Sequence, residues 1–201
     1  MKSRPPVRLE DRLVYSEVIE GLIQHGLGGR VPSRLRERLG DLGLDVDRLP
    51  STFPVVTWHK CLRVLTEELF PGVPMDEAFR RLARQHVEGY GRTLMGRATL
   101  RVMRLLGPRR MVHRLPSVLS ATDNYTAGSV EERGPTQFVL SLNSNMQPGA
   151  YTESLLEAML HTCGAAQPQV KRLESREDSA TYLLTWSEKS EKPEGTSAEP
   201  E

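Results

Sequence analysis

The change from helices to strands, which decides the fold, lies in residues 122–143, TDNYTAGSVEERGPTQFVLSLN. Two runs of alternating residues, Thr122 to Arg133 and Gln137 to Asn143, flank a Gly–Pro pair at 134–135. Alternation on both sides of a turn dipeptide predicts a β-hairpin. Apolar residues before this stretch recur at helical spacing instead, which predicts a helical N-terminal half.

Working upstream, glycines and prolines divide the helical half into separate segments. We expect helices at about 13–26, 33–40, 55–70, 74–89, 94–106 and 108–119. Downstream of the hairpin, helical spacing returns from Tyr151 to Cys163, and Gly164 is a natural C-terminal stop. A second hairpin is predicted from Gln169 to Leu173 and from Ala180 to Trp186. The prediction is an α+β fold, with the N-terminal helical half packed on a small C-terminal antiparallel sheet in the order strand, strand, helix, strand, strand.

The length and composition indicate one globular domain. The chain has 201 residues, of which 38% are hydrophobic and 26% charged. We assign a flexible N-terminus to residues 1–10, a single domain to 11–186 and a disordered tail to 187–201. The tail reads SEKSEKPEGTSAEPE and offers no apolar side chain larger than alanine to bury.

The cysteines and the absence of long apolar runs indicate the cellular compartment of the protein and whether it binds a metal. Cys61 and Cys163 lie far apart in helical patterns and in no zinc-type spacing, so neither a disulfide framework nor a metal site is predicted. No run of about 20 apolar residues could cross a bilayer. We therefore expect a cytoplasmic protein with no membrane partner and no cofactor.

The most unusual feature is the basic segment from Arg80 to Arg114, which holds ten arginines, no lysine and one acid, Glu88, in a chain of net charge +1. Arg97, Arg101 and Arg104 are spaced i, i+4 and i+7 and share one helix face. Arg109 and Arg110 lie at the start of the next helix. Arginine makes paired hydrogen bonds to phosphate or carboxylate groups. The predicted anion-binding residues are Arg97, Arg101, Arg104, Arg109 and Arg110.

Two expectations accompany this site. Leu94, Ala98, Val102, Leu105 and Leu106 should form the apolar side opposite the arginine stripe. Alternatively, the arginines form an ordinary solvated face and pair with acids elsewhere in the chain, such as Glu67, Glu68, Asp76 and Glu77. Nucleic acid is disfavoured because aromatic residues are not interleaved with the basic ones.

The sequence carries no catalytic signature, and we predict that the protein is not an enzyme. The five histidines, at 25, 59, 86, 113 and 161, show no metalloenzyme spacing. His86 lies on the apolar side of its helix, where a core histidine, a buried switch or a haem ligand are the alternatives. Asp123 either bonds a turn or acts in acid–base chemistry. Glycines at 89, 91 and 96 indicate close helix packing more than a phosphate loop.

A series of short motifs resembles an uncharacterised domain family found mostly in myxobacteria. The resemblance runs from about Leu13 to Trp186. The motifs are GLDVDR (43–48), Trp58, LFPG (69–72), EGY with Thr93 (88–93), GRA (96–98), LLGPRR (105–110), NYT (124–126) and YLLTW (182–186). The resemblance implies a stand-alone cytoplasmic protein with many paralogues and no established activity. Asp123 departs from the family's Asn-Asn-Tyr pattern.

By element order, that family is distantly similar to a ligand-binding fold shared by haem-nitric-oxide sensors, vinyl-reductase-type domains and vesicle-tethering subunits. The haem sensors clamp porphyrin with a Tyr-x-Ser-x-Arg motif that this sequence lacks. The resemblance therefore does not extend to haem ligation by His86 or His113.

Together these features predict a non-enzymatic sensory or adaptor domain of cytoplasmic signalling, which binds a small anionic ligand or a protein partner. The alternative is a protein-interaction module, homodimerising or hetero-oligomeric, without a small ligand.

Overall fold

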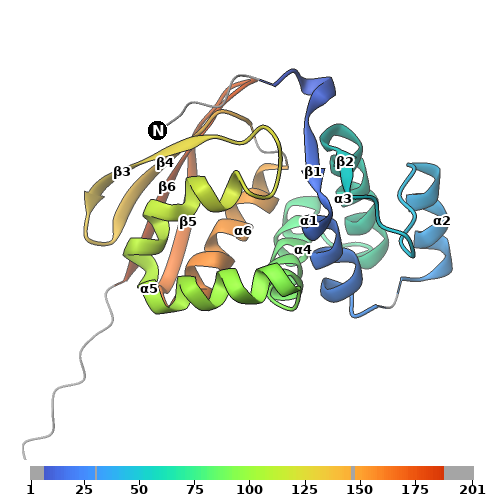
Figure 1. Ribbon diagram of the computed structural model, residues 1–201, viewed down its shortest axis with the longest axis horizontal. Helices are drawn as coiled ribbons and strands as arrows, with labels where there is room; N and C mark the ends of the chain where they lie inside the picture. The colour runs from blue at the N-terminus through green and yellow to red at the C-terminus, as the bar shows by residue number, and fades with distance from the viewer. Residues whose placement is uncertain (1–6, 30, 146–147, 188–201) are drawn as a thin grey trace, which may run out of the picture.

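The computed structural model describes residues 7–29, 31–145 and 148–187, and its N-terminal half is mainly helical (Figure 1). The elements of this half are η1 (Leu9–Asp11), β1 (Leu13–Tyr15), α1 (Ser16–Glu20), η2 (Gly21–Gly26), α2 (Ser33–Asp41), β2 (Thr52–Pro54), α3 (Val55–Leu69) and α4 (Met75–Tyr90). The η2 segment is a π-helix that continues directly from α1. In the described part of the chain, no helix combines the length and apolarity needed to span a membrane.

The C-terminal half contains the sheet and the two helices packed with it. Its elements are α5 (Leu94–Leu119), β3 (Gly128–Gly134), β4 (Gln137–Leu142), α6 (Gly149–Thr162), β5 (Ala166–Ser175) and β6 (Ala180–Ser187). The strands lie in the order β3-β4-β6-β5, and all neighbours are antiparallel. The predicted α+β class and the order strand, strand, helix, strand, strand are therefore confirmed.

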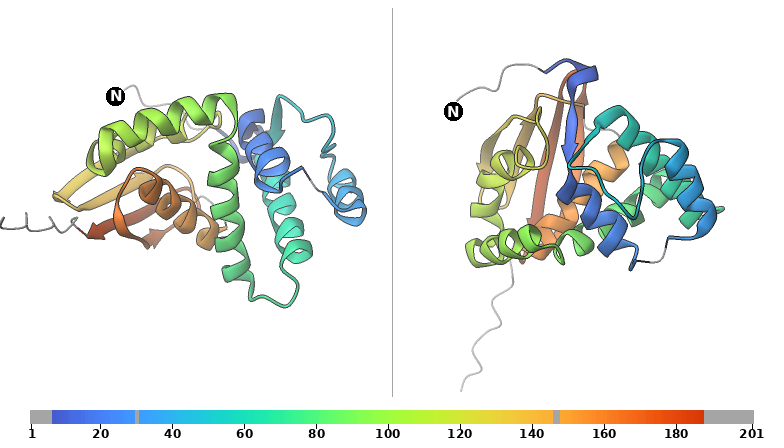
Figure 2. Two further views of the ribbon diagram at one scale, coloured as in Figure 1. Left: turned by 90° about the horizontal axis from the view of Figure 1, so that it is seen from below. Right: turned by 45° about the vertical axis from the view of Figure 1, so that its right-hand side comes forward.

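The described residues form two hydrophobic cores, and one face of the sheet contributes to one of them. Phe138 and Leu140 of β4 pair with Leu184 and Tyr182 of β6, and all four side chains are fully buried. They belong to one cluster with buried residues of both halves of α5 and of α6. The other core lies among β1, α1–α4 and η2. The molecule therefore has a helical part with this core and a sheet part with the other, and in both views of Figure 2 the sheet part lies to the left of the helical part.

Glycine allows the helical part to close tightly. A methyl group at Gly89 in α4 would overlap the backbone of Gly21 and Gly26 in η2. This contact brings α4 and η2 to backbone distance, which only glycine permits. The close-packing interpretation of Gly89 is confirmed.

Besides the short strand β2, which was expected to be part of a loop, two segments differ from the expected secondary structure. Leu13–Tyr15, expected at the start of a helix, forms β1 and pairs with β2, with Val14 opposite Phe53. Residues 122–127, expected in the first hairpin strand, form a turn because the Asp123 carboxylate accepts hydrogen bonds from the backbone N–H groups of Tyr125 and Thr126 (2.9 and 2.6 Å). Strand β3 begins only at Gly128.

The predicted helix break at Gly107 is present, but the predicted apolar face of α5 is wrong. Gly107 has φ 74° and kinks α5 into two halves. In the first half the buried residues are Gly96, Leu100 and Met103. Five residues were expected to face inward. Four of them are instead exposed, namely Leu94, Ala98, Val102 and Leu105, and the fifth, Leu106, is half-buried.

The termini predicted to be flexible, residues 1–10 and 187–201, fall outside the described residues except for 7–10 and 187. The assignment of residues 11–186 to a single domain stays a prediction.

Candidate functional site

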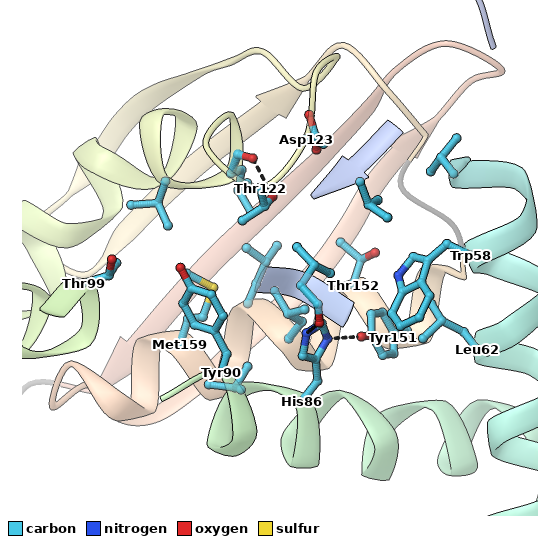
Figure 3. Close-up of a pocket in the computed structure, with 18 of the residues that line it drawn as sticks. Trp58, Leu62, His86, Tyr90, Thr99, Thr122, Asp123, Tyr151, Thr152 and Met159 are labelled. Atoms are coloured by element: carbon cyan, nitrogen blue, oxygen red, sulfur yellow. Dashed lines mark hydrogen bonds between the residues drawn. The ribbon is translucent and has the colours of Figure 1, made fainter. Parts of the chain in front are cut away.

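A cavity of about 120 Å³ lies where the helical part meets α5 and α6 (Figure 3). It is lined by Val14, Val18, Val55, Trp58, His59, Leu62, His86, Val87, Tyr90, Thr99, Leu100, Met103, Val118, Leu119, Thr122, Asp123, Tyr125, Tyr151, Thr152, Leu155, Leu156 and Met159. These residues come from both halves of the chain, from β1 at the N-terminus to α6. Most of them are aliphatic or aromatic, so the cavity suits an apolar occupant.

His86 provides the most constrained polar group of the lining. Its Nε2 lies 2.8 Å from the Val18 carbonyl oxygen, and its Nδ1 bonds the Tyr151 hydroxyl. Since a carbonyl can only accept, Nε2 carries the proton and Nδ1 accepts from the Tyr151 O–H. Burial lowers the pKa of His86 to about 4, although the Val18 carbonyl acts in the opposite direction. His86 is therefore a neutral core histidine in contact with the cavity.

Other polar groups lie around the same space. Burial lowers the pKa of His59 to about 4, so this ring is also neutral near pH 7. Burial raises the pKa of Tyr90, and a side-chain hydrogen bond with Thr99 lowers it in part. Apart from Asp123, whose carboxylate accepts hydrogen bonds from its own turn, the lining offers neutral hydrogen-bonding groups, which favour an uncharged ligand with few polar atoms.

The size of the cavity limits the ligand further. An engineered apolar protein cavity of roughly 150 Å³ binds benzene or xenon, whereas drug-sized ligands occupy pockets of roughly 300–1,000 Å³. A cavity of about 120 Å³ thus has room for a gas molecule or a group of about the size of a small aromatic ring.

The predicted arginine residues lie outside this cavity, on the exposed surface of α5. Arg109 is paired within the chain, with its Nη2 2.6 Å from Glu132 Oε1. Glu132 is also bonded to His113 at 3.0 Å, and both contacts lower the pKa of the Glu132 carboxyl, His113 more than Arg109. Arg109 therefore has an internal counter-ion.

The remaining four arginines differ from Arg109. No carboxylate in residues 7–29, 31–145 or 148–187 forms an ion pair with Arg97, Arg101, Arg104 or Arg110. The first three share one face of the first half of α5, as their spacing requires. Internal pairing occurs instead at Arg81 and Arg84, which both contact Glu77 (2.9 and 3.6 Å). The solvated-face alternative thus describes α4 better than α5.

The residues that could act in acid–base chemistry, Asp123, Tyr125 and His113, do not all lie in the cavity. Asp123 is buried and bonds its own turn, including the Thr126 hydroxyl at 2.6 Å. Tyr125 lies beneath the guanidinium of Arg12, 5.2 Å from it. His113 is half exposed on α5, bonded to Glu132 and outside the cavity lining. Asp123 and Tyr125 thus line the same cavity, but His113 does not join them.

Sequence reasoning missed Trp58, Tyr90, Tyr151 and Met159 as cavity residues. Each occupies an inward helix position, which in a sequence is indistinguishable from an ordinary core position. The one signal was the accumulation of histidine and tyrosine at inward positions of α3, α4 and α6, namely His59, His86, Tyr90 and Tyr151. Polar-tipped rings are less common in a solid core than aliphatic side chains.

Among solved structures, H-NOX domains have folds similar to that of this chain. An oxygen-binding H-NOX domain related to soluble guanylate cyclases gives a TM-score of 0.64 at 12% identity, covering 90% of this chain and 99% of that one. A Cs H-NOX mutant gives 0.65 at 12% identity, covering 87% and 97%. A mutant H-NOX of T. Tengcongensis gives 0.62 at 13% identity, covering 85% and 96%. At such identities the likeness shows the fold alone.

No curated protein matches the chain in sequence. A family described as "Protein of unknown function (DUF2378)" matches residues 12–187. This match includes both cores, the cavity and all of α5. The chain therefore belongs to the DUF2378 family.

Proposed function

We propose that this protein is a non-enzymatic, cytoplasmic sensory domain whose cavity binds a small and mainly apolar ligand. The observation that carries the proposal is a cavity of about 120 Å³ at the junction of the helical and sheet parts of an H-NOX-like fold. Ligand pockets commonly lie at such junctions, where two packed units can shift relative to each other. The neutral ring of His59, which also lines the cavity, would orient the few polar atoms of the ligand.

Helix α5 is the element best placed to report ligand binding. Thr99, Leu100 and Met103 of its first half line the cavity, while Arg97, Arg101 and Arg104 of the same half are exposed. A ligand that shifts the inner side of this half-helix also shifts its outer side, because the helix moves as a rigid rod. Gly107 is a natural hinge for that movement.

The described residues do not fit haem, although the names of two of the H-NOX structures mention oxygen binding and heme. A tetrapyrrole is several times larger than the benzene-sized occupant that about 120 Å³ admits. Both ring nitrogens of His86 are engaged by Val18 and Tyr151. His113 is outside the lining and bonded to Glu132.

Thermal unfolding with a panel of small ligands tests the proposal. Benzene, indole and short-chain alcohols should raise the melting temperature, because a ligand at 100 times its Kd stabilises a protein by about 2.7 kcal/mol. Leu155→Phe, which extends a lining side chain, should abolish the shift. Leu173→Phe makes the same change on the exposed face of β5 and should leave it intact. A panel without any shift, or an equal shift in Leu155→Phe, would contradict cavity binding.

A second candidate is a small anionic ligand at Arg97, Arg101, Arg104, Arg109 and Arg110. The supporting observation is that four of these five have no carboxylate partner among the described residues. Phosphate, pyrophosphate and nucleotides should then raise the melting temperature of the wild type, but not that of the variant with Arg97, Arg101 and Arg104 changed to Gln. Equal shifts in both proteins would exclude this site.

A further inference from the structure

The first half of α5 exposes an apolar stripe that faces away from the protein. Its members are Leu94, Met95, Val102 and Leu105, and Leu94 and Leu105 are 77% and 81% exposed. On a helix with 100° per residue, these side chains lie opposite the buried residues Gly96, Leu100 and Met103. The half-helix therefore has two apolar faces, of which only one is used inside the protein.

The arginines form one edge of this stripe. Arg97, Arg101 and Arg104 occupy the sector between the buried face and the exposed apolar stripe. The opposite edge, at Thr99 and Leu106, carries no charge. The exposed surface of α5 is thus apolar along its centre and basic along one side, over about 16 Å of helix. We call this surface the α5 stripe.

Single exposed leucines are ordinary, but a contiguous apolar row beside uncompensated charge is typical of an interaction site. We infer that the α5 stripe docks a partner protein through a helix with an apolar face edged on one side by carboxylates. The partner's leucine-like side chains would cover Leu94, Val102 and Leu105. Its acidic row would supply the counter-ions that Arg97, Arg101 and Arg104 do not find in the described part of this chain.

A second copy of this chain does not meet the charge requirement through the same stripe. Helix α5 contains no Asp or Glu between Leu94 and Leu119. A symmetric pairing of two stripes would bury apolar surface but would leave Arg97, Arg101 and Arg104 without carboxylates. The partner must therefore bring acidic residues of its own.

An anionic bilayer fits the stripe less well than a protein does. Helices that lie in membrane interfaces usually combine Lys or Arg with Trp or Phe, and α5 carries no aromatic residue. Its charge is also restricted to one edge, whereas a bilayer presents negative headgroups on all sides of an embedded helix. A helix with a single acidic edge matches the one-sided charge.

The test uses the full-length protein and two synthetic helical peptides of equal length. One has a leucine stripe edged by Glu, and the other has Lys in place of each Glu. We expect the Glu peptide to bind the wild type at least tenfold more tightly than the Lys peptide at low salt. Leu105→Ser should weaken that binding at least tenfold, whereas Leu173→Ser, at an exposed leucine of β5, should not change it. Changing Arg97, Arg101 and Arg104 to Glu should reverse the preference between the peptides.

Several outcomes would overturn the inference. They are absence of binding to either peptide, equal binding of both, and indifference to Leu105→Ser. Two parallel measurements test whether a membrane or a second copy of the chain occupies the α5 stripe instead. Cosedimentation with phosphatidylserine vesicles that depends on Leu105 and the arginines would assign the stripe to a membrane. A dimer detected by light scattering and lost in Leu105→Ser would assign it to a second copy of the chain.

Discussion

The Nδ1 atom of His86 in α4 accepts a hydrogen bond from the hydroxyl of Tyr151 in α6, although the two residues are 65 positions apart. The same ring donates from Nε2 to the Val18 carbonyl of α1. One buried imidazole therefore joins three helices at the wall of the cavity. This arrangement accounts for a histidine and a tyrosine in a largely apolar site, because each satisfies the other.

Removing the Tyr151 hydroxyl should destabilise the fold. Tyr151→Phe leaves His86 Nδ1 buried without its donor, so the free energy of unfolding should fall by about 1–3 kcal/mol. Urea denaturation at pH 7 measures the change. Tyr15→Phe, at a half-buried tyrosine of β1, is the matched control and should cost less. Equal losses in the two variants would mean that the bond to His86 adds nothing specific.

Stability should depend on pH through His86. Its pKa is about 4 when folded and has the ordinary value of 6.5 when unfolded, so the unfolded chain binds the proton more readily. The contribution is fully present above pH 6.5 and is lost as the pH falls toward 4. Denaturation midpoints at pH 7.5, 6 and 5 should therefore decrease, and less steeply in His86→Gln. An unchanged slope in that variant would assign the pH dependence to other groups, such as His59.

The contact between α4 and η2 should tolerate no side chain. Gly89→Ala places a methyl group against the backbone of Gly21 and Gly26, neither of which can give way cheaply. We expect a loss of at least 2–3 kcal/mol, as for severe overpacking of a core. Gly40→Ala is the matched control, because Gly40 lies in α2 with open space around it, and alanine should stabilise that helix by about 0.5–1 kcal/mol. Similar effects of the two changes on the melting temperature would refute the tight contact.

Haem should not bind specifically. Titration of the protein with hemin, followed by absorbance, should give no saturable Soret band, because about 120 Å³ cannot hold a tetrapyrrole and His86 is already bonded twice. A one-to-one Soret transition that is lost in His86→Ala would show instead that α5 and α6 open to admit the group.

Much of the fold was readable from local patterns. The strand alternation around Phe138 and Leu140 and the helix stops at Gly107 and Gly164 follow from chemistry within a few residues. By contrast, β1 has three residues, too few to show a period, and exists because it pairs with β2 about forty positions later. Residues 122–127 were expected to belong to a strand, but the hydrogen bonds that the Asp123 carboxylate accepts hold them in a turn.

The candidate site was less predictable, and α5 shows why. Its first half has apolar residues on two faces, and periodicity alone does not say which face meets the core. Leu100 and Met103 were buried by their position beside α4 and α6, so Leu94 and Leu105 were left outside. The cavity itself depends on how two cores meet, and this is a property of tertiary packing.

The most direct test of the central claim is NMR of the protein labelled at the methionine methyl groups, titrated with benzene. Met103 and Met159 line the cavity, whereas Met75 and Met111 pack elsewhere in the two cores. We predict saturable shifts of the Met103 and Met159 methyl signals with little change at Met75 and Met111. Unmoved signals at Met103 and Met159, or equal drifts of all four, would contradict a ligand-binding cavity at the junction of the two halves.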